Sequence, residues 1–486
     1  MIVRIHTIKL LMAVAVVVVQ LSACNRGPQL NDLTFEPHVF ETHDGLRINA
    51  TLGRLVLPES RQKPGSGVIK LAFVRLQSTS ANPGPPIFYL SGGPGVSGIT
   101  HPQGRRAGVL LAMREVADVI LIDQRGTGMT EPRLDCGRLD YPLDQPATRE
   151  GLLRVYRERA RACAEGWKQK GVNLEAYNTN ENADDINALR QALGLEKISL
   201  VAASYGTTLA MTILRRHPGT VHKVIMIGME GPDHTYKLPH NAQKQIGEIV
   251  RLSKENALLQ KLIPDIPQTL SALSDRLKKQ PVKVELQNLA TRENFNVVLG
   301  DFDLRLMTAD SIGHEERIRK FPSMLVFMSR GDFSRLGRWA VEYRQDEISA
   351  MQAAMDCASG VSPERWKRIL EEEPETTLGR DLDFPFPEVC DAWGVPTLDD
   401  SFRSPLASEV PTLFISGTLD VRTPLSNAEE IRKGFPNSTL VVVQGAAHSD
   451  HLFIASPQIG KVMLEFMKGL PVSIQRIEVP FEFEAA

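Results

Sequence analysis

A strand-like run that passes through a serine-centred turn into a helical pattern is the feature that most constrains this chain. Residues 197–201, Lys-Ile-Ser-Leu-Val, form a strand-like run, Ala-Ala-Ser-Tyr-Gly follows at 202–206, and residues 209–216 have a helical pattern. A sharp strand-to-helix turn of this kind exposes a nucleophilic serine, here Ser204, at the end of a sheet strand. Because a serine hydroxyl attacks a carbonyl only where a base takes its proton and donors hold the oxyanion, the turn predicts partners elsewhere in the chain.

An acid and a histidine each follow a later strand-like run, in the order that such a turn predicts. Asp420 ends a Gly-Thr-Leu-Asp sequence after one run, and His448 ends a Gly-Ala-Ala-His sequence after the next. The order Ser, Asp, His is the chain order of a triad built at the strand ends of an α/β sheet. We therefore predict Ser204 as nucleophile, His448 as general base and Asp420 as the group that orients the imidazole. His451 and Asp450 are nearby alternatives, but neither occupies the Gly-x-x-His position.

Glycines upstream of the serine predict an oxyanion hole. Residues 89–95 read Tyr-Leu-Ser-Gly-Gly-Pro-Gly and follow a strand-like run. Glycine lets the backbone come close to a substrate and aim N–H groups at it, so Gly92 or Gly93 would act together with the N–H of Tyr205. The alternative interpretation is a plain Gly-Pro turn.

A second turn motif favours a structural role. Asp-Gln-Arg-Gly-Thr-Gly at residues 123–128 follows another strand-like run. We interpret Asp123 and Arg125 as side chains that fix loops through charge-assisted hydrogen bonds.

The wider pattern predicts an α/β fold, with a mostly parallel central sheet flanked by helices and a large, mainly helical insertion. Short apolar runs bounded by Gly and Pro are typical of strands buried on both faces, and helical patterns alternate with them. The alternation is lost between the two halves of the sheet, where helices are expected at 246–262, 307–319 and 340–355. The predicted divisions are a core at 37–232 and 409–472, a helical cap at 233–408 over the active site, and a C-terminal tail at 473–486.

The N-terminus predicts export and a lipid anchor. Two basic residues precede a short apolar run, as in a secretory signal. Leu-Ser-Ala-Cys at residues 21–24 resembles the lipobox of bacterial lipoproteins, which implies a signal peptide over 1–24, acylation of Cys24 and a tether over 25–36. The expected location is the bacterial cell envelope, facing the periplasm, on the outer rather than the inner membrane. The alternative is an ordinary signal peptide that is cut after Ala23.

The remaining cysteines agree with an oxidising compartment. Lipidation of one of the five leaves an even number, which we pair by neighbourhood as Cys136 with Cys163 and Cys357 with Cys390, although three connectivities are open and four free thiols are an alternative. No close Cys pair or interleaved histidine favours a metal site, so no metal is expected. A net charge of -2 without a long basic run argues against a nucleic-acid partner.

Taken together, the motifs resemble those of the proline iminopeptidase and tripeptidyl aminopeptidase family of α/β-hydrolases. The resemblance covers roughly residues 40–230 and 405–470 and leaves the cap uncovered. It implies a serine exopeptidase that releases N-terminal residues from peptides without metal or organic cofactor, with Ser204, Asp420 and His448 as its triad. Two positions depart from the family pattern: Ala202 replaces the first glycine of Gly-x-Ser-x-Gly, and Ser91 stands where proline iminopeptidases often have histidine.

An aminopeptidase needs a carboxylate for the substrate's free α-ammonium. Glu230, directly after a core strand, is the best-placed acid, with a loop carboxylate facing water as the alternative; Asp332, Glu342 and Asp346 in the cap are further possibilities. The expected partner is therefore a peptide with a free N-terminus. An esterase on the same scaffold and an inactive binding lipoprotein are the competing functions, because a fold alone does not fix the substrate.

Overall fold

The central sheet confirms the predicted α/β class. The computed structural model describes residues 29–484, and its largest sheet has ten strands in the order β1-β2-β3-β5-β4-β7-β8-β12-β13-β14. Strands β1 to β3 are antiparallel, and every pairing from β5 to β14 is parallel. The strands are β1 (Leu33–Glu41), β2 (Arg47–Pro58), β3 (Val68–Leu76), β4 (Ile87–Leu90), β5 (Val119–Ile122), β7 (Ile198–Ser204), β8 (Val221–Met229), β12 (Thr412–Gly417), β13 (Ser438–Gln444) and β14 (Arg476–Glu478).

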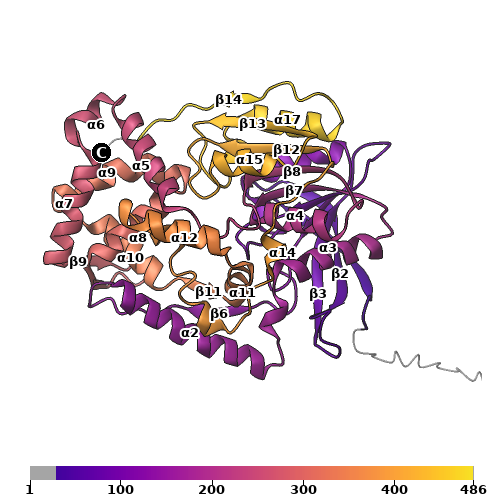
Figure 1. Cartoon of the computed structure of the whole chain (residues 1–486), viewed down its shortest axis with the longest axis horizontal. Helices are drawn as coiled ribbons and strands as arrows, with labels where there is room; N and C mark the ends of the chain where they lie inside the picture. The colour runs from indigo at the N-terminus through magenta and orange to yellow at the C-terminus, as the bar shows by residue number, and fades with distance from the viewer. Residues whose placement is uncertain (1–28, 485–486) are drawn as a thin grey trace, which may run out of the picture.

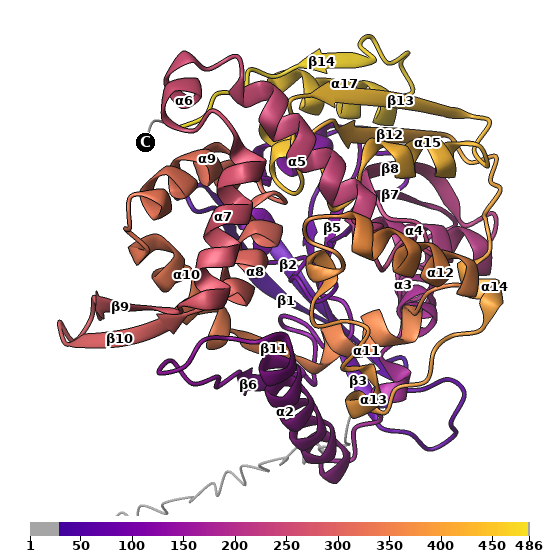
Figure 2. The ribbon, with the colours of Figure 1, turned by 60° about the vertical axis from the view of Figure 1, so that its left-hand side comes forward.

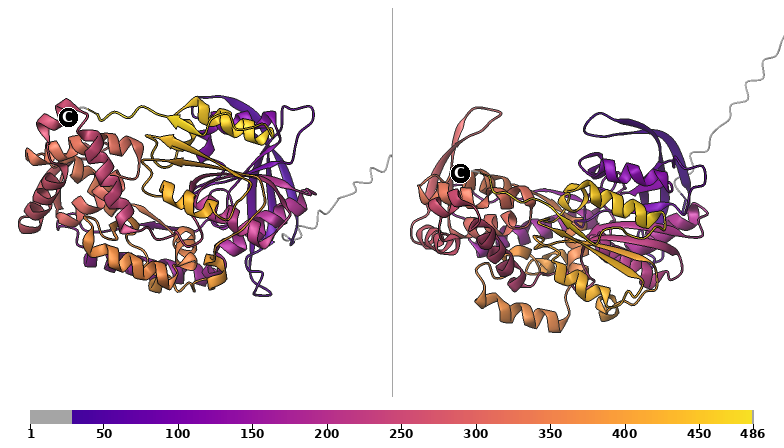
Figure 3. Two further views of the ribbon diagram at one scale, coloured as in Figure 1. Left: turned by 45° about the horizontal axis from the view of Figure 1, so that its top comes forward. Right: turned by 90° about the horizontal axis from the view of Figure 1, so that it is seen from above.

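Both faces of the parallel strands are buried, as their continuous apolar sequences predict. Along β7, Leu200 and Ala202 belong to the hydrophobic cluster on one face, whereas Val201 and Ala203 belong to the cluster on the other. The first face is covered by α3 (Thr179–Ala192), α4 (Tyr205–Arg216) and α15 (Leu425–Arg432), and the second by α1 (Ala107–Ala112) and α17 (Pro457–Met467). Figure 1 and Figure 3 show these helices on either side of the sheet.

The cap, residues 233–408, lies beside the sheet and has a hydrophobic cluster built mainly from its own residues, which Leu419, Val421 and Ala447 join from the loops after β12 and β13. Its helices gather at the left of Figure 1, and Figure 2 shows them from another side. Its elements are α5 (Pro239–Ser253), α6 (Ala257–Leu262), α7 (Ile266–Lys279), β9 (Val282–Gln287), β10 (Asn294–Leu299), α8 (Asp301–Ser311), α9 (Glu315–Ser329), α10 (Ser334–Arg344), β11 (Glu347–Ser349), α11 (Ala350–Ser359), α12 (Pro363–Glu372), α13 (Cys390–Trp393) and α14 (Asp400–Arg403).

The three helices expected in the cap are each interrupted, so the predicted bounds are wrong. In the first, Asn256 caps α6 by accepting hydrogen bonds from two backbone N–H groups, which ends one helix and starts the next. In the second, Gly313 and His314 separate α8 from α9. In the third, strand β11 separates α10 from α11, because it pairs with a distant strand of the chain.

That distant strand belongs to a segment that the sequence placed in the core. β6 (Asp135–Arg138) pairs with β11, and α2 (Arg149–Gln169) packs against α13. Arg149 at the start of α2 also forms an ion pair with Asp381 of the cap, at 2.8 Å between Nη1 and Oδ1. The excursion between β5 and α3 therefore packs with the cap, although the prediction assigned all of 37–232 to the core.

Both ends of the described chain contribute strands, which corrects two predicted boundaries. β1 begins at Leu33 and pairs with β2, so residues 33–36 lie in the sheet and not in a tether. The predicted tail contains β14, which adds to the edge of the sheet beside β13. No helix within residues 29–484 has the length and apolar character needed to cross a bilayer. The predicted signal peptide and Cys24 lie outside the described residues.

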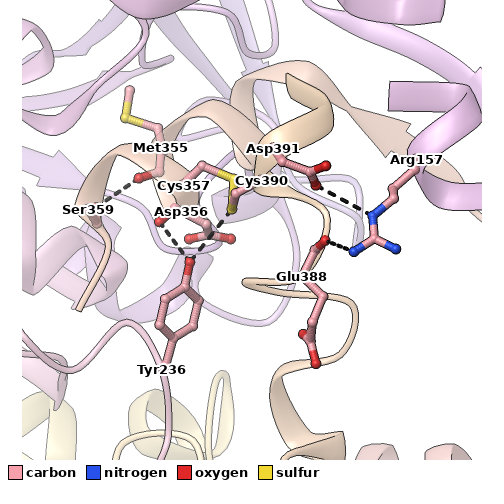
Figure 4. The surroundings of a disulfide bond; sticks show 9 residues. All are labelled: Arg157, Tyr236, Met355, Asp356, Cys357, Ser359, Glu388, Cys390 and Asp391. Atoms are coloured by element: carbon pink, nitrogen blue, oxygen red, sulfur yellow. Dashed lines mark hydrogen bonds and ion pairs between the residues drawn. A yellow bond between two sulfur atoms is a disulfide. The ribbon is translucent and has the colours of Figure 1, made fainter. Parts of the chain in front are cut away.

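The two disulfides present are the predicted pairs. Cys136 bonds to Cys163, which joins β6 to α2, and Cys357 bonds to Cys390, which joins α11 to α13. Figure 4 shows the second bond and its surroundings, with Asp356 next to it. The first bond lies in the excursion that packs with the cap, and the second lies within the cap itself.

Candidate active site

Ser204 stands at a strained turn between β7 and α4. Its backbone has φ 53° and ψ -125°, a region that favours glycine. The close packing that this turn requires is supplied by Gly206, where an added Cβ would lie 2.2 Å from the carbonyl oxygen of Leu90. Ala202, which replaces the first glycine of the family pattern, is fully buried in the strand and has no unusual φ. The methyl group at 202 is therefore accommodated.

The structure brings Ser204, His448 and Asp420 together. His448 Nε2 lies 3.1 Å from Ser204 Oγ, and His448 Nδ1 lies 2.8 Å from Asp420 Oδ2. Asp420 and His448 lie in the loops that follow the parallel neighbours β12 and β13, so the strand register places the two loops side by side. Ser204 Oγ, the imidazole and the carboxylate thus form a continuous hydrogen-bonded row with the geometry of a nucleophile, a base and an orienting acid.

Thr423 completes this row, and its role was not predicted from the sequence. Its hydroxyl donates to Asp420 Oδ2 at 2.6 Å and lies 3.0 Å from His448 Nδ1, while its backbone N–H donates to Asp420 Oδ1 at 2.8 Å. These bonds hold an almost fully buried carboxylate in position. The Thr423-Pro424 pair, three residues after Asp420, is the sequence feature from which this role could have been predicted.

The two rival residues have other partners. His451 Nδ1 accepts the backbone N–H of Ala447 at 3.1 Å. Asp450 forms an ion pair with Arg106, at 2.6 Å between Oδ1 and Nε. Neither bonds to Ser204 within the described residues.

The predicted oxyanion loop lies against the serine. An added Cβ at Gly92 would come within 2.9 Å of Ser204 Cβ, so only glycine allows this approach. Gly93 has φ 109°, and both glycines line the cavity above the serine. Tyr205 is the first residue of α4, where a backbone N–H has no partner within the helix. Gly92 and Gly93 thus line the cavity beside Ser204, and Tyr205 begins the helix that follows it.

The Asp-Gln-Arg-Gly-Thr-Gly motif has the structural role that was predicted. Asp123 accepts hydrogen bonds from the Ser97 hydroxyl and from the N–H of Met129, at 2.6 and 2.7 Å. Arg125 is fully buried and binds Asp185 of α3 through two nitrogens, each at 2.8 Å. Both side chains fasten loops behind the site.

A cavity of about 500 Å³ opens above the serine and extends into the cap. This volume falls within the range of small-molecule sites. The charged and catalytic side chains at its wall include Ser204, Glu230, Asp356, Asp383, Arg422 and His448. The cavity therefore combines the hydrogen-bonded row with several ionisable groups contributed by the cap and the loops beneath it.

Glu230 is buried in the cavity wall and does not face water. Its Oε2 lies 3.1 Å from Lys237 Nζ, which also donates to two backbone carbonyls. The alternative of a solvated loop carboxylate is therefore wrong for Glu230, and part of its charge is balanced by the lysine.

Asp356 and Asp383 are two cavity acids that the sequence reasoning missed. Burial, together with the charge of Glu230, raises the pKa of Asp356 well above its usual range. Its carboxylate accepts no hydrogen bond from any residue of the described chain. Its backbone oxygen accepts the Tyr236 hydroxyl at 3.4 Å (Figure 4) and the N–H of Gly360 at 3.2 Å. Burial raises the pKa of Asp383 to about 6, and its Oδ2 accepts the N–H of Lys237 at 2.6 Å. Asp356 precedes Cys357, but nothing local in the sequence marks it as a cavity residue.

The three further acids named from the sequence are placed differently from one another. Asp346 lines the cavity. Asp332 is exposed and accepts the N–H of Ser334 at 2.9 Å, and Glu342 is also exposed and away from the cavity. Only Asp346 of these can meet a ligand in the cavity.

Comparisons with known proteins agree with this architecture. A family model described as "alpha/beta hydrolase fold" matches residues 85–454. The serine protease Hip1 of Mycobacterium tuberculosis is 28% identical over 191 residues, which are 38% of this chain and 36% of that protein. The chain therefore matches only about a third of the length of this relative.

Two further relatives and one solved structure are similar to the chain. The tripeptidyl aminopeptidase of Streptomyces lividans is 23% identical over 433 residues, 84% of this chain and 79% of that protein. The proline iminopeptidase of Arabidopsis thaliana is 27% identical over 214 residues, 43% of each chain. A proline iminopeptidase-related protein of Thermus thermophilus has a solved structure with 15% identity and a TM-score of 0.38, covering 86% of this chain and 97% of that one.

Proposed function

This chain belongs to the α/β-hydrolase family, and from that premise we propose that it is a serine exopeptidase that releases one or a few residues from the N-termini of peptides. The observation that carries the proposal is the hydrogen-bonded row of Ser204, His448 and Asp420 at the floor of a cavity with an acidic wall. The row supplies a nucleophile, and the acidic wall supplies a counter-charge for a free ammonium group.

The chemistry follows from the positions of the three side chains. Ser204 Oγ attacks the substrate carbonyl carbon while His448 Nε2 takes the hydroxyl proton, and Asp420 stabilises the imidazolium that forms. The N–H groups of the oxyanion loop and of Tyr205 hold the oxygen that becomes negative. The C–N bond then breaks as His448 gives the proton to the leaving nitrogen, which leaves an acyl group on Ser204. Water, activated by the same imidazole, hydrolyses this ester and frees the serine.

Recognition of a free N-terminus is assigned to the acidic wall. Glu230 was predicted for this role, and it lies at the cavity with one cationic neighbour, Lys237. Asp356 is the better acceptor, because its carboxylate has no donor within the described chain and the cavity is open to it. A substrate ammonium next to Asp356 would favour the ionised form, and so the two groups would gain a charge-assisted bond in a partly desolvated place.

The names of the relatives support a peptidase over other hydrolases. One is a tripeptidyl aminopeptidase, one a proline iminopeptidase and one a serine protease. Identities of 23–28% do not transfer a specificity, so the number of residues released is left to experiment. We further propose that the protein is exported and held at the cell envelope through Cys24, on the support of the lipobox-like sequence and of two disulfides.

The function is tested with the soluble form that lacks residues 1–24. We expect cleavage of unblocked prolyl, alanyl or tripeptidyl arylamides and no cleavage of the same amides with a blocked N-terminus. Ser204→Ala, folded as shown by circular dichroism, should lose all turnover. Turnover of p-nitrophenyl esters without any amide turnover would instead identify an esterase, and no turnover of any substrate would identify a binding protein. Labelling of intact cells with a radioactive fatty acid, with Cys24→Ser as control, tests the anchor.

A further inference from the structure

Arg422 is a cation in the cavity wall without a matching acid. It lies two residues after Asp420 and is half-buried. Its guanidinium makes one hydrogen bond, from Nη1 to the carbonyl oxygen of Leu382 at 2.9 Å. Among residues 29–484 no carboxylate forms an ion pair with it, although its charge acts on Asp383 from a greater distance. An arginine has five N–H donors in a planar fork, so most of this fork is available.

The other arginine at the cavity shows what a matched cation looks like in the same place. Arg106 donates from Nε to Asp450 at 2.6 Å and from Nη1 to the Tyr89 hydroxyl at 2.7 Å. It also stacks over the ring of Phe453, with 4.4 Å between Cζ and the ring centroid. Arg106 is thus held within the protein, whereas Arg422 is left with one neutral acceptor.

The position of Arg422 relates it to the leaving group of the reaction. The next residue, Thr423, bonds to His448 Nδ1, so the two side chains belong to one short loop beside the imidazole. His314 is a further cavity residue, and burial and the charge of Arg422 lower the pKa of His314 to about 4, with a contribution from His448. His314 is therefore neutral when the enzyme works. Arg422 thus lines the cavity next in sequence to Thr423, the residue that contacts the imidazole which protonates the leaving nitrogen.

We propose that Arg422 binds a carboxylate on the leaving-group side of the substrate. This deepens the proposed peptidase function and rests on it. The carboxylate is either the free C-terminus of a short peptide that ends soon after the scissile bond, or an acidic side chain at that position. A planar guanidinium matches a carboxylate with two parallel N–H···O bonds, which is why arginine suits this role.

The two unmatched groups of the cavity then have complementary purposes. Asp356 meets the ammonium at one end of the substrate, and Arg422 meets the carboxylate on the other side of the scissile bond. A short peptide with both termini free carries both charges. Burial disfavours the charged form of Asp356, and Arg422 forms no ion pair within residues 29–484, so a zwitterionic substrate supplies an opposite charge to each of them. The preferred substrate class is therefore short free peptides.

The experiment compares matched substrates rather than absolute rates. Wild-type enzyme is given the same short peptide as a free acid and as a C-terminal amide, and a third peptide amide with Glu after the scissile bond. We expect the free acid, the Glu peptide or both to be cleaved about 10- to 100-fold more efficiently in kcat/KM than the neutral amide, the range of a charge-assisted hydrogen bond. A preference for the free acid identifies the C-terminus as the source, and a preference for the Glu peptide identifies the side chain.

Arg422→Met should abolish this preference while an unblocked arylamide, which carries no carboxylate, is still cleaved. Arg432→Met, at an exposed arginine at the end of α15, removes the same charge away from the cavity and should keep the preference. The readout is a ratio of two substrates within each variant, so a general loss of activity does not obscure it. If Arg422→Met is inactive or unfolded, Arg422→Gln and Arg422→Lys replace it, and the preference for the carboxylate is expected only in the lysine variant. Equal cleavage of acid and amide by the wild type, or an unchanged ratio in the variants without charge, overturns the proposal. Failure of every amide substrate, including the arylamide, would instead reject the peptidase function itself.

Discussion

The strain at Ser204 leads to a stability prediction that does not depend on the substrate. At φ 53° and ψ -125° a residue with a Cβ is disfavoured, and such conformations cost of order 1–3 kcal/mol each. Both Ser204→Ala and Ser204→Gly lose the hydroxyl that lies 3.1 Å from His448 Nε2. The comparison of these two variants therefore isolates the effect of the Cβ on the backbone.

Three contributions set the expected difference. Glycine removes about 1–3 kcal/mol of strain, but its freedom in the unfolded chain costs about 0.4–1 kcal/mol relative to alanine. The loss of one half-buried methyl group costs up to roughly 0.8 kcal/mol. With mid-range values we expect Ser204→Gly to be more stable than Ser204→Ala by about 0.5–1 kcal/mol.

The measurement is equilibrium urea unfolding of both variants with the disulfides intact, followed by tryptophan fluorescence. Ala202→Gly is the matched control: it lies two residues earlier in the same strand, is fully buried and has no positive φ. At position 202 glycine should lower the free energy of unfolding. It adds conformational freedom to the unfolded chain and removes a buried methyl group, and there is no backbone strain for it to relieve. If Ser204→Gly proves no more stable than Ser204→Ala, the turn stores no strain and the reasoning is refuted.

Three further changes test the site and its support. Asp420→Asn should lower kcat by about 10³–10⁴-fold with the fold retained, since the amide cannot stabilise an imidazolium; a loss below tenfold would contradict the assignment of the acid. In Gly92→Ala the new Cβ would lie 2.9 Å from Ser204 Cβ and displace the oxyanion loop, so kcat should fall by at least about 10²-fold. If this variant reacts with a fluorophosphonate as fast as the wild-type enzyme does, the role of the loop is contradicted. Arg125→Met leaves a buried carboxylate without its main partner and should destabilise the fold by about 3–5 kcal/mol, as measured by urea unfolding, with a change below 1 kcal/mol as the contrary result.

The parts of the fold that could be predicted are those whose cause is local. The parallel strands read as apolar runs because both of their faces are buried, and the serine turn, the acid and the histidine follow such runs directly. Parallel strands bring their exit loops to one edge, so the order along the chain was enough to group Ser204, Asp420 and His448. The close disulfide pairs follow from neighbourhood in the same way.

The parts that could not be predicted have distant causes. β11 forms because β6, more than two hundred residues earlier, pairs with it, and nothing within residues 340–355 indicates a break. β14 is short and gains its place only at the open edge of β13. The predicted end of the tether failed for the same reason, since residues 33–36 become a strand through their pairing with β2.

The same distinction explains why the reaction was more accessible from sequence than the specificity. The catalytic row is fixed by strand ends, whereas the cap is fixed by contacts between remote side chains. Arg344, fully buried, binds Asp303 and three backbone carbonyls of other segments, and so sets the position of α10 relative to α8. Asp356 is in turn positioned by α11 and by the disulfide to α13. Substitutions within the cap should therefore redirect the choice of substrate while the row of Ser204, His448 and Asp420 stays intact, because no bond of that row is made by a cap residue.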